Sequence, residues 1–166
     1  SRLGGEAGGS QAGVAVLAPT VVGLTAPPGR RSHILEPGRV VAAHVHWGVR
    51  GGFVAISVYL RDGEGLQGEN LSSVWRIVEY LHELNSRGYD WIVGGDWNMA
   101  CADLDKASWV QRVKGSMLKP NSTTCRKTLP GTNTDYHIIS KGMMLQMGPG
   151  AEVDEAATAW PHRPVR

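Results

Sequence analysis

The fold of this chain is decided by the stretch Trp91-Ile92-Val93-Gly94-Gly95-Asp96-Trp97-Asn98. An apolar strand runs into two glycines, which let another backbone or a ligand approach closely, and then delivers a carboxylate and a carboxamide. If the strand continues past the glycines, Asp96 and Asn98 point to the same face. That pair suits a site that holds a hydrated metal ion and orients a phosphate oxygen. Turn formation is the alternative, since Asp and Asn also stabilise tight turns.

Other segments extend this pattern along the chain. Residues 134–140 place Asp135 at the head of a strand-like apolar run, and residues 161–165 bring His162 close to the end of the sequence. Upstream, residues 13–17 and 53–60 are also rich in β-branched and apolar side chains and predict strands.

In this order, the segments resemble the endonuclease/exonuclease/phosphatase superfamily of metal-dependent phosphoesterases, which includes apurinic endonucleases and the endonuclease domains of retrotransposons. The resemblance extends from about Gly13 to Val165 and is most specific over residues 94–98, although the family more often has Phe at the position of Trp97. It implies an α/β fold in which a two-sheet β-sandwich is flanked by helices, the four-layer αββα arrangement. Residues 1–166 would form one such domain, with a glycine-rich leader over residues 1–12.

The resemblance also implies the site. The Asp that matches Asp96 orients and deprotonates the attacking water, and the Asn that matches Asn98 donates a hydrogen bond to a phosphate oxygen. His162 would contact the scissile phosphate and pair with Asp135, whose carboxylate favours the cationic imidazole. Tyr59 would hydrogen-bond the phosphate from the edge of the site. Mg²⁺ or Mn²⁺, held through Asp96 and Asn98, would neutralise the developing charge.

Two departures from the family pattern weaken this site. Family members begin with two strands that end in an Asn and in a Glu that ligates the metal, whereas here a glycine-rich run with Glu6 as its only carboxylate precedes residues 13–17. The family's last His follows Ser-Asp, and here Trp160 and Pro161 stand in those places. The sequence therefore predicts a domain that is incomplete at its N-terminus and impaired in activity.

The function implied is metal-dependent phosphodiester hydrolysis of the endonuclease type, with DNA as the partner and a retroelement as a possible source. A phosphatase acting on small phosphoesters or lipids is an alternative, because substrate choice depends on loops, and so is an inactive remnant. The net charge of +2 is too small to indicate nucleic acid by itself. Arg126 and Lys127 lie in a basic segment between the two Asp motifs and are candidate substrate-binding residues; a solvated loop surface is the alternative.

Composition and periodicity predict one α/β domain, since 166 residues of which 42% are hydrophobic can bury one core. No apolar run approaches the ~18 residues of a membrane span, and no signal-peptide pattern is present, which favours an intracellular protein. Strands are predicted over residues 14–18, 20–25, 40–46, 53–60 and 90–96, and an irregular region from there to about residue 123. A helix is predicted over residues 71–86, with Asn70 as its N-cap and Gly88 ending it. On the 53–60 strand, the aliphatic face should enter the core and leave Tyr59 on the other side.

Overall fold

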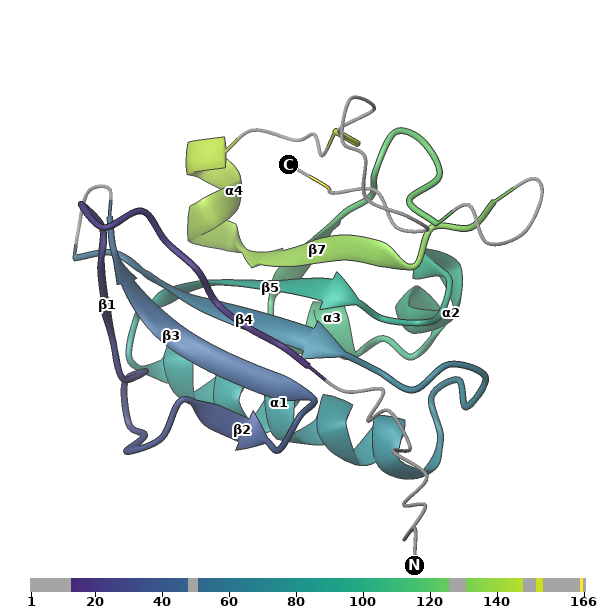
Figure 1. Ribbon diagram of the computed structural model, residues 1–166, viewed down its shortest axis with the longest axis horizontal. Helices are drawn as coiled ribbons and strands as arrows, with labels where there is room; N and C mark the ends of the chain where they lie inside the picture. The colour runs from purple at the N-terminus through teal and green to yellow at the C-terminus, as the bar shows by residue number, and fades with distance from the viewer. Residues whose placement is uncertain (1–12, 48–50, 126–130, 148–151, 154–164, 166) are drawn as a thin grey trace, which may run out of the picture.

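The computed structural model describes residues 13–47, 51–125, 131–147, 152–153 and 165, and the elements in them alternate between strands and helices (Figure 1). The strands are β1 (Gly23–Thr25), β2 (Ile34–Glu36), β3 (Val40–His46), β4 (Phe53–Tyr59), β5 (Asp90–Asp96), β6 (Gly115–Leu118) and β7 (Asp135–Ser140). The helices are α1 (Gly68–Ser86), α2 (Cys101–Lys106), α3 (Trp109–Arg112) and α4 (Lys141–Met147).

All seven strands belong to one sheet, in the order β1-β3-β4-β5-β7-β6, with β2 also paired to β3. The neighbouring strands β3 and β4 are antiparallel and form a hairpin. Strands β4 and β5 are parallel and are connected through α1, whereas β7 runs antiparallel to β5. As a result, the C-terminal ends of β4 and β5 and the beginning of β7 meet at the same edge of the sheet.

The two faces of the sheet are covered differently. Helix α1 lies along one face and α4 lies across the other (Figure 1). On the α1 face, Val54, Ile56 and Val58 are buried with residues of α1, α2 and α3, so the aliphatic side of β4 faces the core as predicted. On the other face, Ile139 and Met143 form a smaller cluster under α4. This second face also carries Tyr59, as expected from its place in β4.

Helix α1 is amphipathic, and its buried residues recur at three- and four-residue spacing. It ends as predicted, since Gly88 follows the last turn with a φ of 73° and its N–H donates to Asn85 O at 3.2 Å. The predicted N-cap is wrong: the cap is Gln67, and Asn70 lies inside the first turn, 2% exposed. The sequence pattern missed this because the buried contacts of Asn70 are made with a loop, not with its own helix.

Several predicted boundaries change. Residues 14–18 are not a strand: they alternate in exposure like one, but no described strand pairs with them. The strand predicted over residues 20–25 is limited to β1, because a turn in which Val22 N–H donates to Pro19 O precedes it. The region predicted to be irregular contains α2, α3 and β6, and neither β2 nor α4 was predicted. These short elements have too few residues to show a periodicity.

The α/β fold class is confirmed: a seven-stranded sheet is flanked by four helices, an arrangement consistent with the α/β sandwich of the endonuclease/exonuclease/phosphatase fold. Within the described part of the chain, one of the two expected sheets is present. Of the helices described, none is long and apolar enough to cross a membrane.

Candidate active site

Three of the predicted site residues lie side by side at the edge where β4, β5 and β7 meet. Tyr59 is the register partner of Asp96, and Asp96 is the register partner of Asp135. Register partners on neighbouring strands point to the same face, with Cβ atoms roughly 5 Å apart. All three side chains are partly buried. The sheet therefore brings a phenol and two carboxylates together from positions far apart in the sequence.

The two glycines before Asp96 are required by two different close contacts. A Cβ on Gly95 would lie 2.0 Å from Val58 O, and the φ of Gly95 is 147°, so its backbone conformation also favours glycine. A Cβ on Gly94 would lie 2.3 Å from Cδ2 of His137. Gly95 therefore admits the backbone of β4, and Gly94 admits an imidazole ring.

Asn98 is placed by a turn. Strand β5 ends at Asp96, Asn98 has a φ of 47°, and its backbone N–H donates to Oδ1 of Asp96 at 3.0 Å. This is a local Asp-headed turn. Strand alternation therefore does not set the direction of the Asn98 side chain, contrary to the expectation from spacing. Instead, its Nδ2 donates to Leu60 O at 2.7 Å, which holds the amide beside the end of β4.

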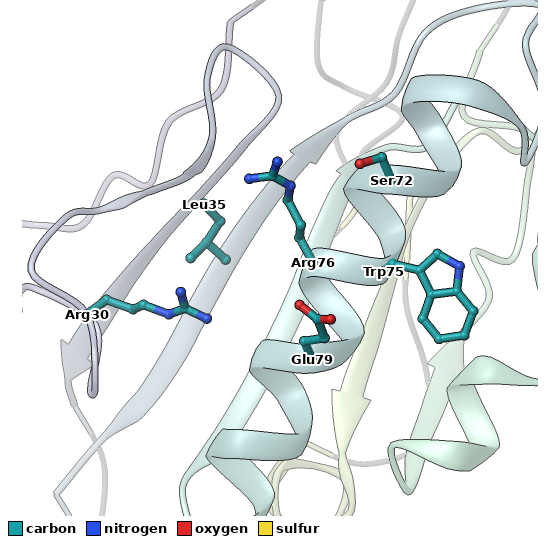
Figure 2. Close-up of a pocket in the computed structure, with 6 residues that line it drawn as sticks. All are labelled: Arg30, Leu35, Ser72, Trp75, Arg76 and Glu79. Carbon is teal, nitrogen blue, oxygen red and sulfur yellow. The ribbon is translucent and has the colours of Figure 1, made fainter.

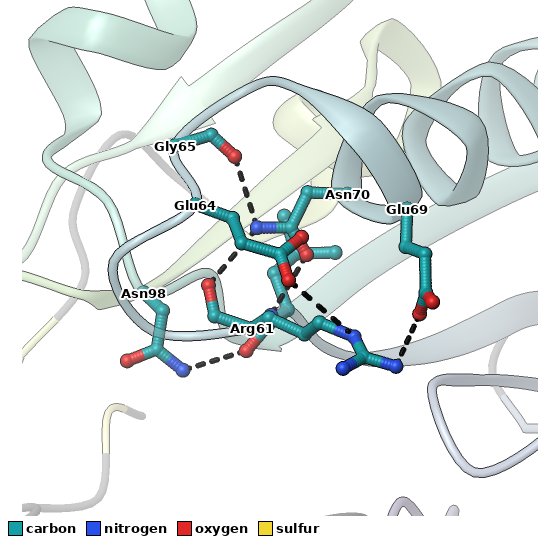
Figure 3. Close-up of polar contacts among 7 residues, drawn as sticks. Arg61, Glu64, Gly65, Glu69, Asn70 and Asn98 are labelled. Carbon is teal, nitrogen blue, oxygen red and sulfur yellow. Dashed lines mark hydrogen bonds and ion pairs between the residues drawn. The ribbon is translucent and has the colours of Figure 1, made fainter.

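The loop after β4 is fixed by two asparagines (Figure 3). Asn98 binds Leu60 O, and the buried side chain of Asn70 accepts from Arg61 N–H at 2.8 Å and donates to Arg61 O and Gly65 O, both at 2.9 Å. The Arg61 guanidinium forms an ion pair with Glu69. These contacts keep the loop in one position next to Asp96.

Asp135 is positioned through a buried hydroxyl. Thr124 is fully buried, and its Oγ1 accepts hydrogen bonds from the N–H groups of Thr134 at 3.1 Å and Asp135 at 3.0 Å. Thr134 Oγ1 donates to Oδ2 of Asp135 at 3.2 Å. Trp97, also fully buried, donates from Nε1 to the carbonyl of the residue after Asp135 at 3.1 Å, so the ends of β5 and β7 are tied together.

Three other predicted residues, His162, Arg126 and Lys127, lie outside the described residues, as do Trp160 and Pro161. The proposed pairing of His162 with Asp135 therefore remains a prediction.

Two residues on this face were missed by sequence reasoning. Arg39 places its guanidinium 5.2 Å from the centroid of the Tyr59 ring, and its NH1 is buried without a hydrogen-bond partner. His137 follows Asp135 by two residues in β7 and lies against Gly94. The two-residue spacing of Asp135 and His137 was a usable signal, because side chains two apart on a strand share a face. Arg39 carries no such signal.

The donors at this edge are those of a hard cation. The carboxylates of Asp96 and Asp135 and the amide oxygen of Asn98 are the ligand type that Mg²⁺ and Mn²⁺ prefer. Two like charges directly opposite on neighbouring strands are destabilising, and a divalent cation between them would relieve this. In the described part of the chain, no group of three or more His, Cys, Asp or Glu side chains gathers around a single point. The residues therefore fit such an ion in kind and form a partial ligand set.

A separate pocket of about 410 Å³ lies between α1 and the segment of β2, and none of the predicted site residues lines it (Figure 2). Its lining residues are Arg30, Leu35, Ser72, Trp75, Arg76 and Glu79. Arg76 is neutralised by Glu36 at 2.9 Å.

No protein-family model and no curated protein sequence matches the chain. Solved structures do match. The endonuclease domain of TRAS1, a telomere-specific non-LTR retrotransposon, has 15% sequence identity and a TM-score of 0.63 over 87% of this chain and 65% of its own. A cytolethal distending toxin structure from Actinobacillus actinomycetemcomitans has 21% identity and a TM-score of 0.55 over 75% of this chain and 51% of its own. The 3′ phosphatase NExo from Neisseria, bound to a product DNA hairpin, has 16% identity and a TM-score of 0.53 over 89% of this chain and 70% of its own.

The chain thus has the fold of the endonuclease/exonuclease/phosphatase proteins. It spans about half to two thirds of the length of the first two of these structures.

Proposed function

We propose that this chain is a metal-dependent phosphodiesterase domain of the endonuclease type, with DNA as its substrate. The observation that carries this proposal is the row Tyr59, Asp96 and Asp135 at the C-terminal edge of the parallel strands β4 and β5. In α/β sheets, ligands bind at this edge of the strands. The fold shared with nucleases and a DNA phosphatase supports the reaction class.

Each residue in the row has a chemical role in this proposal. Asp96 accepts the proton of the attacking water and orients it towards the phosphorus atom. Asn98 uses one amide N–H to bind Leu60 O at 2.7 Å, which leaves the second N–H for a phosphate oxygen. Tyr59 donates from the edge of the site, with its ring held under the Arg39 guanidinium. Asp135 would orient an imidazole that faces the phosphate, the role proposed for His162.

A divalent ion held by Asp96, with Asn98 or Asp135 beside it, would supply charge neutralisation at the phosphoryl oxygens. We expect weak activity, because Asp96, Asn98 and Asp135 supply few protein ligands and fewer protein ligands lower the affinity for the ion. Substrate binding by Arg126 and Lys127 also remains part of the proposal.

Nicking of supercoiled plasmid DNA in the presence of Mg²⁺ or Mn²⁺ tests the proposal. We expect slow nicking that stops with EDTA and falls ~10²–10⁴-fold on Asp96→Ala, the range for loss of a general base. The matched control is Asp103→Ala, which removes an exposed carboxylate on α2 that pairs with Lys106. The proposal would be overturned if the Asp96→Ala variant still nicked the plasmid. It would also be overturned if the wild type failed to nick it at every metal concentration.

A phosphatase is the second candidate function, supported by the fold shared with a 3′ phosphatase. Two further substrates, assayed beside the plasmid, distinguish the candidates. One is a DNA hairpin that carries a 3′-phosphate, and the other is an inositol phosphate. Phosphate release from the hairpin without plasmid nicking would favour the DNA phosphatase. Release only from inositol phosphate would favour a small-molecule phosphatase.

A further inference from the structure

A pair of histidines stands at the opposite end of the sheet from the candidate active site. His44 and His46 lie at the end of β3, which is antiparallel to β4. They are therefore next to the beginning of β4, whereas Tyr59 is the last residue of that strand. Strand β4 has seven residues, so the two ends are about 20 Å apart. The chemistry of this pair is thus independent of the proposed phosphodiesterase.

The two imidazoles share one face of β3 and lean towards each other. Residues two apart on a strand point to the same side, and the partner of His44 in β4 is Val54, which is buried in the core under α1. The partner of His44 in β1 is Thr25. Nε2 of His46 lies 2.8 Å from Oγ1 of this Thr25, so the ring of His46 reaches back to the row of His44. The two ring centroids are 4.4 Å apart.

The nitrogens of the pair are in the form that a metal ion needs. Nε2 of His44 is buried and has no hydrogen-bond partner, and the backbone of Gly51 hydrogen-bonds the same ring, so this bond falls on Nδ1. A backbone bond at Nδ1 fixes the tautomer that keeps the lone pair on Nε2. A buried nitrogen without a partner is costly, and coordination to an ion would remove this cost. His46 is exposed, and its Nε2 is held by a hydroxyl that an ion can replace.

We propose that His44 and His46 bind one divalent transition-metal ion through their two Nε2 atoms, Cu²⁺ most tightly and Zn²⁺ less tightly. Bonds from zinc to imidazole are about 2.0–2.1 Å long, so two nitrogens on one ion lie within about 4 Å of each other. Rings whose centroids are 4.4 Å apart reach this separation when the exposed ring of His46 turns about its side-chain bonds.

The chemistry of the two ligands selects this class of ion. Imidazole nitrogen suits copper, zinc and nickel, whereas Mg²⁺ prefers oxygen. Within the described ranges of the chain, no third His, Cys, Asp or Glu side chain joins the pair. Water therefore completes the coordination. With so few protein ligands, the order of affinity follows the intrinsic order of the metals, in which Cu²⁺ exceeds Zn²⁺.

The test is a calorimetric titration of the whole chain with Cu²⁺ in excess Mg²⁺, which competes for the oxygen ligands of the candidate active site. We expect one tightly bound ion per chain and an electron paramagnetic resonance spectrum with hyperfine splitting from two imidazole nitrogens. His44→Gln and His46→Gln should each weaken binding by about 10-fold or more, since loss of a group that merely orients a metal ligand already costs about 10- to 100-fold. The control His82→Gln changes an exposed histidine on α1 and should bind Cu²⁺ as the wild type does.

His46→Gln decides the inference, because an exposed side chain can be replaced without disturbing the core. Equal affinity of His46→Gln and the wild type for Cu²⁺ would overturn it, and so would a spectrum without two nitrogens. Weaker binding by a folded variant of one histidine and not of the other would also overturn it, because the site needs both rings. The melting temperature without metal shows whether His44→Gln is folded. If it is not, His46→Gln and the spectrum of the wild type give the answer.

Discussion

Asp96 and Asp135 lie directly opposite each other on the antiparallel strands β5 and β7, at the end where the parallel strand β4 also stops. The carboxylates come from segments about forty residues apart in the chain, with α2, α3 and β6 between them. Thr124 sets the position of Asp135, and the turn at Asn98 sets that of Asp96. This relationship places two carboxylates side by side at the edge and motivates the first prediction.

Mg²⁺ should stabilise the folded protein through this carboxylate pair. At a concentration about ten times the dissociation constant, binding contributes ~1.4 kcal/mol, which raises the melting temperature by about 3–6 °C. Asp96→Asn should remove most of the shift, whereas Asp103→Asn should retain it. Thermal unfolding with and without EDTA measures this. An equal Mg²⁺ shift in wild type and Asp96→Asn would exclude Asp96 as a ligand.

The two glycines should respond differently to substitution. Gly94→Ala meets the side chain of His137 and should cost about 1–3 kcal/mol of unfolding free energy, the range for overpacking. In a His137→Ala background the same change should cost little. Gly95→Ala meets the backbone of Val58 at a φ of 147° and should cost ~3 kcal/mol or more in both backgrounds.

A double-mutant cycle measured by urea denaturation gives the coupling between positions 94 and 137. Gly95→Ala in the same His137→Ala background is the matched control. Additive effects of Gly94→Ala and His137→Ala would contradict the packing of the imidazole against Gly94.

Replacing Asn98 separates its hydrogen bond from its backbone conformation. Asn98→Ala loses the bond to Leu60 O and places alanine at a φ of 47°, so we expect a cost of ~2 kcal/mol. Asn98→Gly loses the same bond but tolerates this φ, so we expect ~1 kcal/mol. Urea unfolding of both variants tests this. Equal stability of the two variants would show that the left-handed conformation adds no strain.

Stability should fall in mild acid because of His137 and His44. Burial is the main cause that lowers the pKa of both imidazoles in the folded protein, so the unfolded chain binds more protons as pH falls below about 6.5. The free energy of unfolding that is present above this pH is then lost progressively, until the pH reaches the pKa of these imidazoles in the folded protein. His137→Phe should lose less stability than the wild type between pH 7.5 and 5.5, as measured by denaturant unfolding.

The exposed His82 supplies the control for this pH effect, because His82→Gln should show the same loss as the wild type. If His137→Phe lost as much stability between pH 7.5 and 5.5 as the wild type, His137 would not contribute to the acid destabilisation.

Local patterns were sufficient for part of this protein. The strands β3, β4 and β5, the alternation of β4 and the helical spacing of α1 are each confirmed, because the periodicity of buried side chains reports local backbone geometry. The chemical nature of Asp96, Asn98 and Asp135 also predicts a metal-dependent phosphoesterase site, which the variants described above test.

The rest depended on contacts between distant segments. The register of β4, β5 and β7 placed Tyr59 between Arg39 and Asp96, and it placed the ring of His137 on Gly94. The turn at Asn98, with its bond to Leu60 O, replaced the simple alternation expected of a strand. A sequence pattern reports which face a residue occupies, but the partner across the sheet is set by strand order and register, which only the tertiary structure decides.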